Sequence, residues 1–307
     1  MSGRADIYEQ IGANKRKTIL LMLVAIALLA AVGYAIGLWF RVGPAAILVA
    51  LLVAVLLQIG AYRYGDRLVL ASARAKEVTP QQEPRLHNVV EGLAIAAGIP
   101  KPRVWIVPER SPNAFATGRD PEHSHVAVTQ GLLDTMNRVE LEGVIGHEMS
   151  HILDRDILYG TIVATVIGAV VLISEFFLRA MWWGGFGGRR GDDRGGGGAE
   201  ALVFAVGLVL LILAPLFGQL IQLAVSRNRE YLADAQGAML TRYPPGLISA
   251  LEKIRDAPHA MRSANNATAH LWLEQPSRFP GEKTGTLERL FSTHPPIEDR
   301  IRRLREM

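Results

Sequence analysis

The feature that most limits the fold of this chain is a set of four long apolar runs, which favour insertion into a membrane. The first two runs carry no charged residue, and each exceeds or matches the roughly 20 residues needed to cross the hydrocarbon layer. The third is interrupted by Glu175 and Arg179, and the fourth carries Pro215. We therefore expect a multi-pass membrane protein with two transmembrane hairpins. The runs cover residues 18–40, 43–62, 161–181 and 201–225.

The second hairpin, residues 161–225, leaves two arrangements open. Glu175 and Arg179 are four residues apart, so they can pair on one helix face near the end of a full span. Alternatively, the hairpin dips into the membrane, or packs on the first hairpin, without crossing. A Gly-rich loop with Arg and Asp, residues 184–198, joins its two runs.

The positions of Lys and Arg in short loops predict the orientation of the chain in the membrane. The linker between the first two runs holds only Arg41, whereas the other flanks are more basic. This bias places both termini and both long polar stretches on the cytoplasmic side. The basic residues on that side include Lys15, Arg16, Lys17, Arg63, Arg67, Arg227 and Arg229.

The two polar stretches are each too small for a separate core, so we expect them to form one catalytic domain that the second hairpin divides. The expected fold class is α+β and mainly helical. The expected units are a hairpin over 1–63, a first half-domain over 64–160, a second hairpin over 161–225 and a second half-domain over 226–307. Helices are expected over 84–97, from about 132, and over 137–154, 245–255, 267–273 and 297–305. Strands are expected over 103–107 and 125–129, with an edge strand within 111–118.

Composition excludes several kinds of function. The chain has no cysteine, which rules out disulfides, thiolate catalysis and metal sites that use cysteine. Its formal net charge is +4, and most of the positive residues lie beside apolar runs. These charges therefore indicate membrane topology rather than a nucleic-acid surface.

The sequence VIGHEMSHILDRD, residues 144–156, carries the chemistry. His147 and His151 are four residues apart, so on a helix both imidazoles can bind one ion. Zinc accepts such nitrogens, and Glu148 lies close enough to act as general base on a zinc-bound water and then as proton donor. The alternative is an ordinary helix face with scattered polar groups.

The residues around this motif place it outside the bilayer. Polar residues precede it from Asn137 to Glu142, and Asp154 to Asp156 follow it. An intramembrane protease would instead have apolar flanks. We therefore expect a site in the soluble part of the chain, about ten residues before the third run.

A third ligand is expected just after the fourth apolar run. Glu230 and Asp234 are also four residues apart on an expected helix. Glu230 can complete a His/His/Glu set, and Asp234 can accept the outer N–H of a ligating histidine. The alternative is a solvated juxtamembrane face on which Arg227, Arg229 and Glu230 pair with one another.

Four segments together resemble the HtpX-type membrane zinc metallopeptidases, which are relatives of the CAAX prenyl endopeptidases. The resemblance covers nearly the whole chain, including the order of the apolar runs. The long loop at 184–198 departs from the commoner pattern. The four segments are NAFATG (113–118), GVIGHEMSHILDRD (143–156), RNREYLADAQGA (227–238) and THPPIEDRI (293–301).

This resemblance implies a zinc endopeptidase of the prokaryotic inner membrane that faces the cytoplasm and acts in quality control of damaged membrane proteins. Its cofactor would be one Zn²⁺ per chain, held by His147, His151 and Glu230. Glu148 would be the base, and Asp234 would support a ligand. The expected partners are protein substrates and the lipid bilayer, with no nucleic acid; self-association stays open.

The resemblance also indicates further site residues. Asn113, Ala114 and Phe115 match a substrate-facing edge strand, although Ser-Pro-Asn is also a common turn sequence. His294 and Arg300 match residues that lie over the active site in prenyl-protease relatives, where a cation can stabilise an oxyanion. The alternative is that His294 lies beside a helix start and that Arg300 pairs on the surface.

Two other functions remain open at this point. A non-enzymatic membrane protein could hold a structural metal, but such sites normally have four protein ligands and no fourth is evident. Prenyl-protein processing would use the same chemistry on a different substrate.

Overall fold

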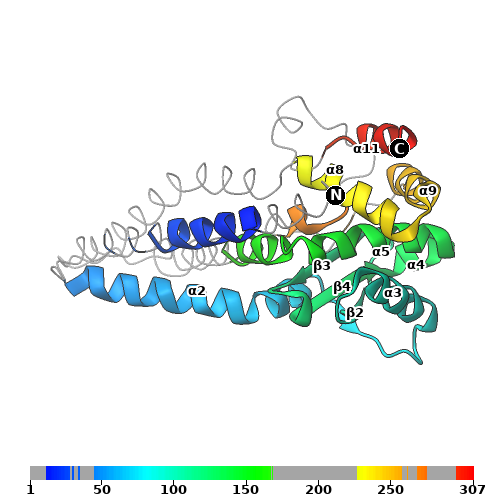
Figure 1. Cartoon of the computed structure of the whole chain (residues 1–307). Coiled ribbons are helices and arrows are strands. Elements are labelled where there is room, and N and C mark those ends of the chain that lie inside the picture. The colour runs from blue at the N-terminus through cyan, green and yellow to red at the C-terminus, as the bar shows by residue number, and fades with distance from the viewer. Residues whose placement is uncertain are drawn as a thin grey trace, which may run out of the picture.

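The chain forms a mainly helical α+β structure in which helices gather around a small sheet at one end of the long helix α2 (Figure 1). This computed structural model describes residues 12–27, 30, 34, 45–166, 168, 227–257, 261, 268–274 and 295–307. The helices are α2 (Ala45–Ser72), α3 (Pro84–Ala97), α4 (Gln130–Thr135), α5 (Arg138–Leu153), α8 (Arg227–Thr241), α9 (Pro244–Arg255) and α11 (Ile297–Arg305), with 3-10 turns η1 (Pro121–His123) and η2 (Ala269–Leu271). The strands are β1 (Lys76–Glu77), β2 (Arg103–Val107), β3 (Ala114–Gly118) and β4 (Ser124–Thr129).

The sheet has the strand order β1-β2-β4-β3, so β3 lies at an edge as expected from the sequence. β2 and β4 run parallel, whereas β1 pairs with β2 and β3 pairs with β4 in antiparallel fashion. One long side of β3 is therefore paired with β4. Its other side is turned toward α5 and the short helix Ile157–Val166.

The described part of the chain contains one helix that is long and apolar enough to cross a membrane. It covers Ile47–Ser72, and its most apolar window has a mean hydropathy of 1.9 with 22% of its residues buried. It contains most of the second apolar run. The third run beyond residue 168, the fourth run and the loop 184–198 lie outside the described residues, so the two hairpins stay a prediction.

Most of the short-range predictions are confirmed. α3 begins with Pro84 at its first turn and ends at Gly98, which adopts the left-handed conformation with φ of 67°. The helix expected over 267–273 is wrong, because only a 3-10 turn forms there and Trp272 is already extended. The N–H of Leu273 donates to the Ala114 carbonyl of β3, so a strand-like contact replaces helical bonding.

The core is built around α5, against which α3, α8 and α9 pack. α5 begins with a capping box: the Asn137 side chain accepts the Glu140 N–H, and the Glu140 carboxylate accepts the Asn137 N–H. The same carboxylate accepts hydrogen bonds from Ser249 (2.6 Å) and Lys253 (2.7 Å) of α9. One buried carboxylate therefore fixes both the start of α5 and its position against α9.

We expect Glu140→Gln to lower the stability of the protein at neutral pH by about 1–2 kcal/mol, from the weakened cap and charge-assisted bonds. Burial alone would raise the pKa of Glu140, but Lys253 and Ser249 outweigh it and hold that pKa below its usual value. The stabilisation is therefore present above the unfolded pKa of about 4.3 and disappears as the pH falls through the lower folded value. Thermal unfolding of the detergent-solubilised protein at several pH values measures this.

Glu142→Gln is the matched control. Glu142 lies on the same turn of α5, and its ion-pair partner in the described part of the chain is Arg138, whose side chain is 75% exposed. An exposed pair of this kind contributes little to stability. Equal losses in the two variants would contradict the anchoring role of Glu140.

Candidate metal centre

The candidate site depends on an unusually close contact between α5 and α8. A Cβ atom at Gly237 would lie 2.7 Å from the backbone nitrogen of His147, and one at Gly146 would lie 3.1 Å from the Gly237 carbonyl oxygen. Only glycine permits the two helix backbones to approach so closely. This contact places Glu230 and Asp234 of α8 beside the histidines of α5.

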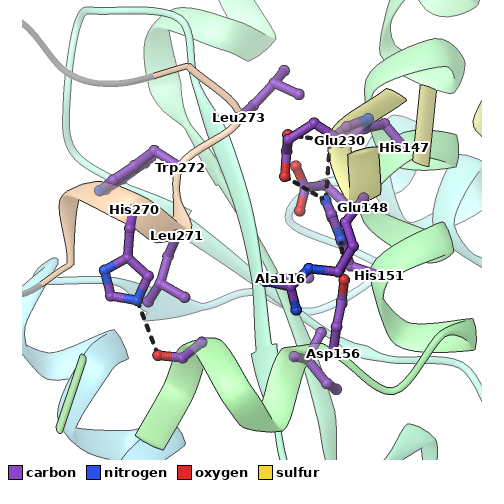
Figure 2. Close-up of a pocket in the computed structure, with 13 residues that line it drawn as sticks. Ala116, His147, Glu148, His151, Asp156, Glu230, His270, Leu271, Trp272 and Leu273 are labelled. Carbon is purple, nitrogen blue, oxygen red and sulfur yellow. Dashed lines mark hydrogen bonds and ion pairs between the residues drawn. The ribbon is translucent and has the colours of Figure 1, made fainter. Parts of the chain in front are cut away.

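Three side chains converge on one point at this contact (Figure 2). The Nε2 atoms of His147 and His151 lie 3.1 Å apart. The two carboxylate oxygens of Glu230 lie 3.7 Å from these atoms, one from each imidazole. All three donor atoms lie within 4.8 Å of one another, which is the spacing of groups that share a metal ion.

The outer nitrogens of both imidazoles are held by carboxylates. Nδ1 of His147 lies 2.9 Å from Asp234, and Nδ1 of His151 lies 3.1 Å from Asp156. An N–H at each Nδ1 leaves each Nε2 with its lone pair directed at the common point. Two lone pairs and a carboxylate directed at one point form a donor set that fits a cation.

The charges around the histidines agree with this arrangement. Burial alone would lower the pKa of His151, but the Asp156 and Glu230 carboxylates outweigh it and raise that pKa to about 10. Burial lowers the pKa of His147 despite its contact with Asp234. A positive charge between the two imidazoles is therefore favoured: a proton on His151 when no metal is bound, or a metal ion in its place.

Glu148 lies next to this donor set and is almost fully buried, with 2% of its surface exposed. Burial raises the pKa of its carboxyl to about 7, and the nearby Glu230 carboxylate adds to that shift. Its carboxylate accepts the backbone N–H of Ala116 in β3. A carboxyl that can take and release a proton near neutral pH is suited to acid–base chemistry.

A buried ion pair supports His147 from behind. The Arg300 guanidinium of α11 donates two hydrogen bonds to Asp234, at 2.7 and 2.8 Å, and a third to the Leu273 carbonyl at 2.8 Å. Burial alone would raise the pKa of Asp234, but the adjacent Arg300 lowers it to about 2. Asp234 therefore stays ionised and holds the Nδ1–H of His147.

A cavity opens beside the donor set. Figure 2 shows His147, His151 and Glu230 on one side of it and residues 270–273 on the other. The wall residues Leu271, Trp272 and Leu273 are apolar. The remaining lining residues are Ala116, Glu148, Asp156, Ile157, Gly160, Arg229 and His270.

The structure thus brings together five of the residues expected at the site, and it places Arg300, Asn113 and Phe115 differently. Arg300 does not line the cavity and contacts Asp234 instead. Asn113 is 3% exposed, and its side chain bridges to residue 274. Phe115 packs edge-on against Trp272, with ring centroids 4.7 Å apart. His294 lies outside the described residues, so its role stays a prediction.

Sequence reasoning missed three parts of the site. Asp156 was read only as a polar flank, although a second ligating histidine also needs an acceptor for its outer N–H. Ala116, one residue beyond the expected substrate-binding set, is the β3 residue that lines the cavity. The wall at 270–273 carries no sequence signal of its own, because its position depends on pairing with β3.

We expect Arg300→Leu to destabilise the protein by about 3–5 kcal/mol, because it leaves the buried Asp234 carboxylate without its cation. Arg302→Leu on the same helix is the control, since the Arg302 side chain is 64% exposed and pairs with Asp299 at the surface. Thermal unfolding of the metal-free protein measures both. Similar midpoints for the two variants would show that the Arg300–Asp234 pair is not a structural support.

Comparisons with known proteins identify the family. Residues 80–307 match the model of Peptidase family M48. Proteins named "Protease HtpX homolog" match over almost the whole chain. The one from Thermoanaerobacter pseudethanolicus is 47% identical over 304 residues, which are 99% of this chain and 99% of that protein. The one from Dictyoglomus thermophilum is 46% identical over 300 residues, 98% of this chain and 94% of that protein.

A solved structure supports the same fold. The crystal structure of S. mikatae Ste24p superposes with a TM-score of 0.51 at 16% sequence identity, covering 96% of this chain and 66% of that one. At this identity the likeness concerns the fold alone. Together with the family match and the extent of the similarity to the HtpX proteins, it shows that the chain belongs to peptidase family M48 and is a membrane metalloprotease.

Proposed function

We propose that this metalloprotease is a zinc endopeptidase in which His147, His151 and Glu230 hold one zinc ion and Glu148 is the general base. The observation that carries the proposal is the convergence of two imidazole Nε2 atoms and a carboxylate within 4.8 Å, beside a buried carboxyl at the wall of a cavity. Neutral imidazole and carboxylate are ligands that zinc accepts, and three protein ligands are typical of a catalytic zinc site. A zinc ion bound there would supply a Lewis acid that acidifies water and polarises the peptide carbonyl.

The protein's own residues would then manage the proton and the substrate. Glu148 takes the proton of the attacking water and delivers it to the leaving amine. Its burial beside Glu230 keeps its pKa close to neutral, so that both steps are accessible. Leu271 and Trp272 form an apolar wall on the opposite side of the cavity.

Asp234, Asp156 and Arg300 act as positioning residues in this proposal. Each carboxylate fixes the tautomer of one histidine, and Arg300 keeps Asp234 ionised. An oxyanion contact for Arg300 is less well supported, because the guanidinium is fully buried and already bonded to Asp234 and the Leu273 carbonyl.

We further propose that the enzyme cleaves misfolded or damaged membrane proteins at the cytoplasmic face of the prokaryotic inner membrane. The cavity supports this location, since Ile157 and Gly160 of the apolar helix Ile157–Val166 line it. The same helix contacts α2, because Thr161 and Thr165 lie against Gly65. A site so close to a membrane helix can reach chain segments that emerge from the bilayer. Self-association of the enzyme is compatible with this proposal but is not needed by it.

Two alternatives differ in the use of the metal or in the substrate. A structural metal is disfavoured because, within the described residues, the cluster that could hold an ion has three members and opens on a cavity. A prenyl-protein processing enzyme would share every residue of the site. Offering a prenylated CAAX peptide and an unfolded membrane protein to the same preparation distinguishes these two substrates.

The test of the proposed function is Glu148→Gln, which removes the base and leaves the three ligands. We expect its casein cleavage to fall by about 10²–10⁴-fold while it retains one zinc per chain. Glu230→Ala, in contrast, should lose zinc and activity together. Metal content by mass spectrometry and cleavage rate are measured on the same samples.

Asp134→Asn provides a control for this test, since Asp134 is an exposed carboxylate of α4 that bonds Gln130. It should keep both zinc and turnover. Unimpaired cleavage by Glu148→Gln would remove Glu148 as the base. Full zinc content in Glu230→Ala would remove Glu230 from the ligand set.

The absence of cysteine allows a direct test of the cytoplasmic orientation. We expect a single cysteine at the exposed position Ala96 of α3 to react with a membrane-impermeant maleimide in inside-out vesicles. The same variant in intact spheroplasts should stay unlabelled, because α3 then faces the sealed interior. Labelling of spheroplasts instead would reverse the proposed topology.

A further inference from the structure

The outer edge of β3 is the surface on which an extended substrate would pair, and its hydrogen-bonding groups are unevenly available. In an antiparallel pair, alternate residues direct their N–H and C=O groups to opposite sides of the strand. On β3 these groups of Ala114, Ala116 and Gly118 face away from β4, because each makes contacts outside the sheet. The outer edge of β3 can therefore offer a substrate backbone the N–H and C=O groups of three residues at most.

The chain itself occupies the edge at Ala114. The Leu273 N–H donates to the Ala114 carbonyl at 2.8 Å, and the Ala114 N–H donates to the Asn113 side chain at 3.0 Å. The Asn113 amide also holds residue 274, donating to its carbonyl at 2.8 Å and accepting its N–H at 3.2 Å. Trp272, next to Leu273, is 1% exposed and packs on Phe115.

The Thr161 hydroxyl occupies the other end of the edge. It accepts the Gly118 N–H at 3.2 Å and lies 3.2 Å from the Gly118 carbonyl oxygen, while its own proton is donated at 2.7 Å to the Ile157 carbonyl of the same helix. It also contacts the Thr117 hydroxyl at 2.8 Å. Gly118 has φ of 146°, and a Cβ there would lie 2.3 Å from the His123 carbonyl oxygen, so the strand turns away at this residue.

Ala116 is the edge residue that remains for a substrate. It lines the cavity, and its N–H points to the Glu148 carboxylate. Its carbonyl oxygen lies on the same side of the strand, and none of the hydrogen bonds found among the described residues uses it. A substrate N–H can therefore reach this one carbonyl directly beside the general base.

We propose that an extended substrate pairs with β3 at Ala116 alone, and that Thr161 is a specificity-determining residue whose hydroxyl sets this register. The inference rests on the proposed endopeptidase function. It adds how many residues of β3 form hydrogen bonds with the substrate backbone. A single pairing residue lets the enzyme accept short extended segments, since no long strand has to be accommodated.

The experiment replaces backbone amides of a cleaved peptide one at a time by esters, which removes a single N–H donor and keeps the chain shape. The scissile amide stays intact. In the wild-type protein we expect one ester to lower kcat/KM by about three- to tenfold, the effect of one lost hydrogen bond. Esters two residues before and after it, which would face Ala114 and Gly118, should change kcat/KM less than about twofold.

Three variants test the role of Thr161. Thr161→Ala removes the hydroxyl that lies against both edge groups of Gly118, so a second ester two residues from the first should become harmful. Thr161→Ser keeps the hydroxyl and should retain the wild-type pattern. Thr165→Ala is the matched control one turn along the same helix, because the Thr165 hydroxyl donates to the Thr161 carbonyl and does not contact β3 in the described structure.

The outcomes separate the possibilities. Two or more harmful esters spaced by two residues in the wild-type protein would overturn pairing at Ala116 alone. An unchanged pattern in Thr161→Ala would overturn the role of Thr161. If Thr161→Ala does not fold, loss of the wild-type pattern in Thr161→Ser would overturn that role equally. No cleavage of the unmodified peptide, or full cleavage by Glu148→Gln, would instead count against the proposed function itself.

Discussion

The backbone contact between α5 and α8 at Gly146 and Gly237 is the constraint on which the site depends. α5 ends at Leu153 and α8 begins at Arg227, so nothing local in the sequence brings the two helices together. Two glycines remove the side chains that would hold the helices apart. The approach is then close enough for Glu230, two turns before Gly237, to share a point with the histidines of α5. A single added methyl group at Gly237 would separate the two halves of the donor set.

This contact buries several charges, which costs free energy unless each is compensated. Asp234 has Arg300, and Asp156 has the imidazole of His151. Each partner also fixes something the chemistry needs, because the carboxylates determine which imidazole nitrogens carry hydrogen. The Glu148 carboxyl accepts the Ala116 N–H, but its burial still raises its pKa to about 7. The free-energy cost of burial therefore falls on Glu148, whose role in acid–base chemistry benefits from a raised pKa.

Much of this could be predicted from the sequence, because it depends on local signals. Pro84 at a helix start, Asn137 with Glu140, and the two histidines four residues apart each act within one turn of helix. Asp234 followed from the need of a ligating histidine for an acceptor. The errors concern contacts across the fold. Residues 267–273 look helical alone, but Leu273 bonds Ala114, more than 150 positions away in sequence. Ala116 is an unremarkable alanine until β3 is placed beside Glu148.

The closed ends of β3 resolve a conflict that any protease with an edge strand faces. An open edge presents unpaired N–H and C=O groups and invites aggregation. Closing the whole edge would remove the surface that receives a substrate backbone. In this chain the wall at residues 270–273 covers one end, and Thr161 of the helix Ile157–Val166 covers the other. The uncovered residue between them lies beside the acid–base group, so substrate pairing is confined to the place where it brings a peptide bond to Glu148.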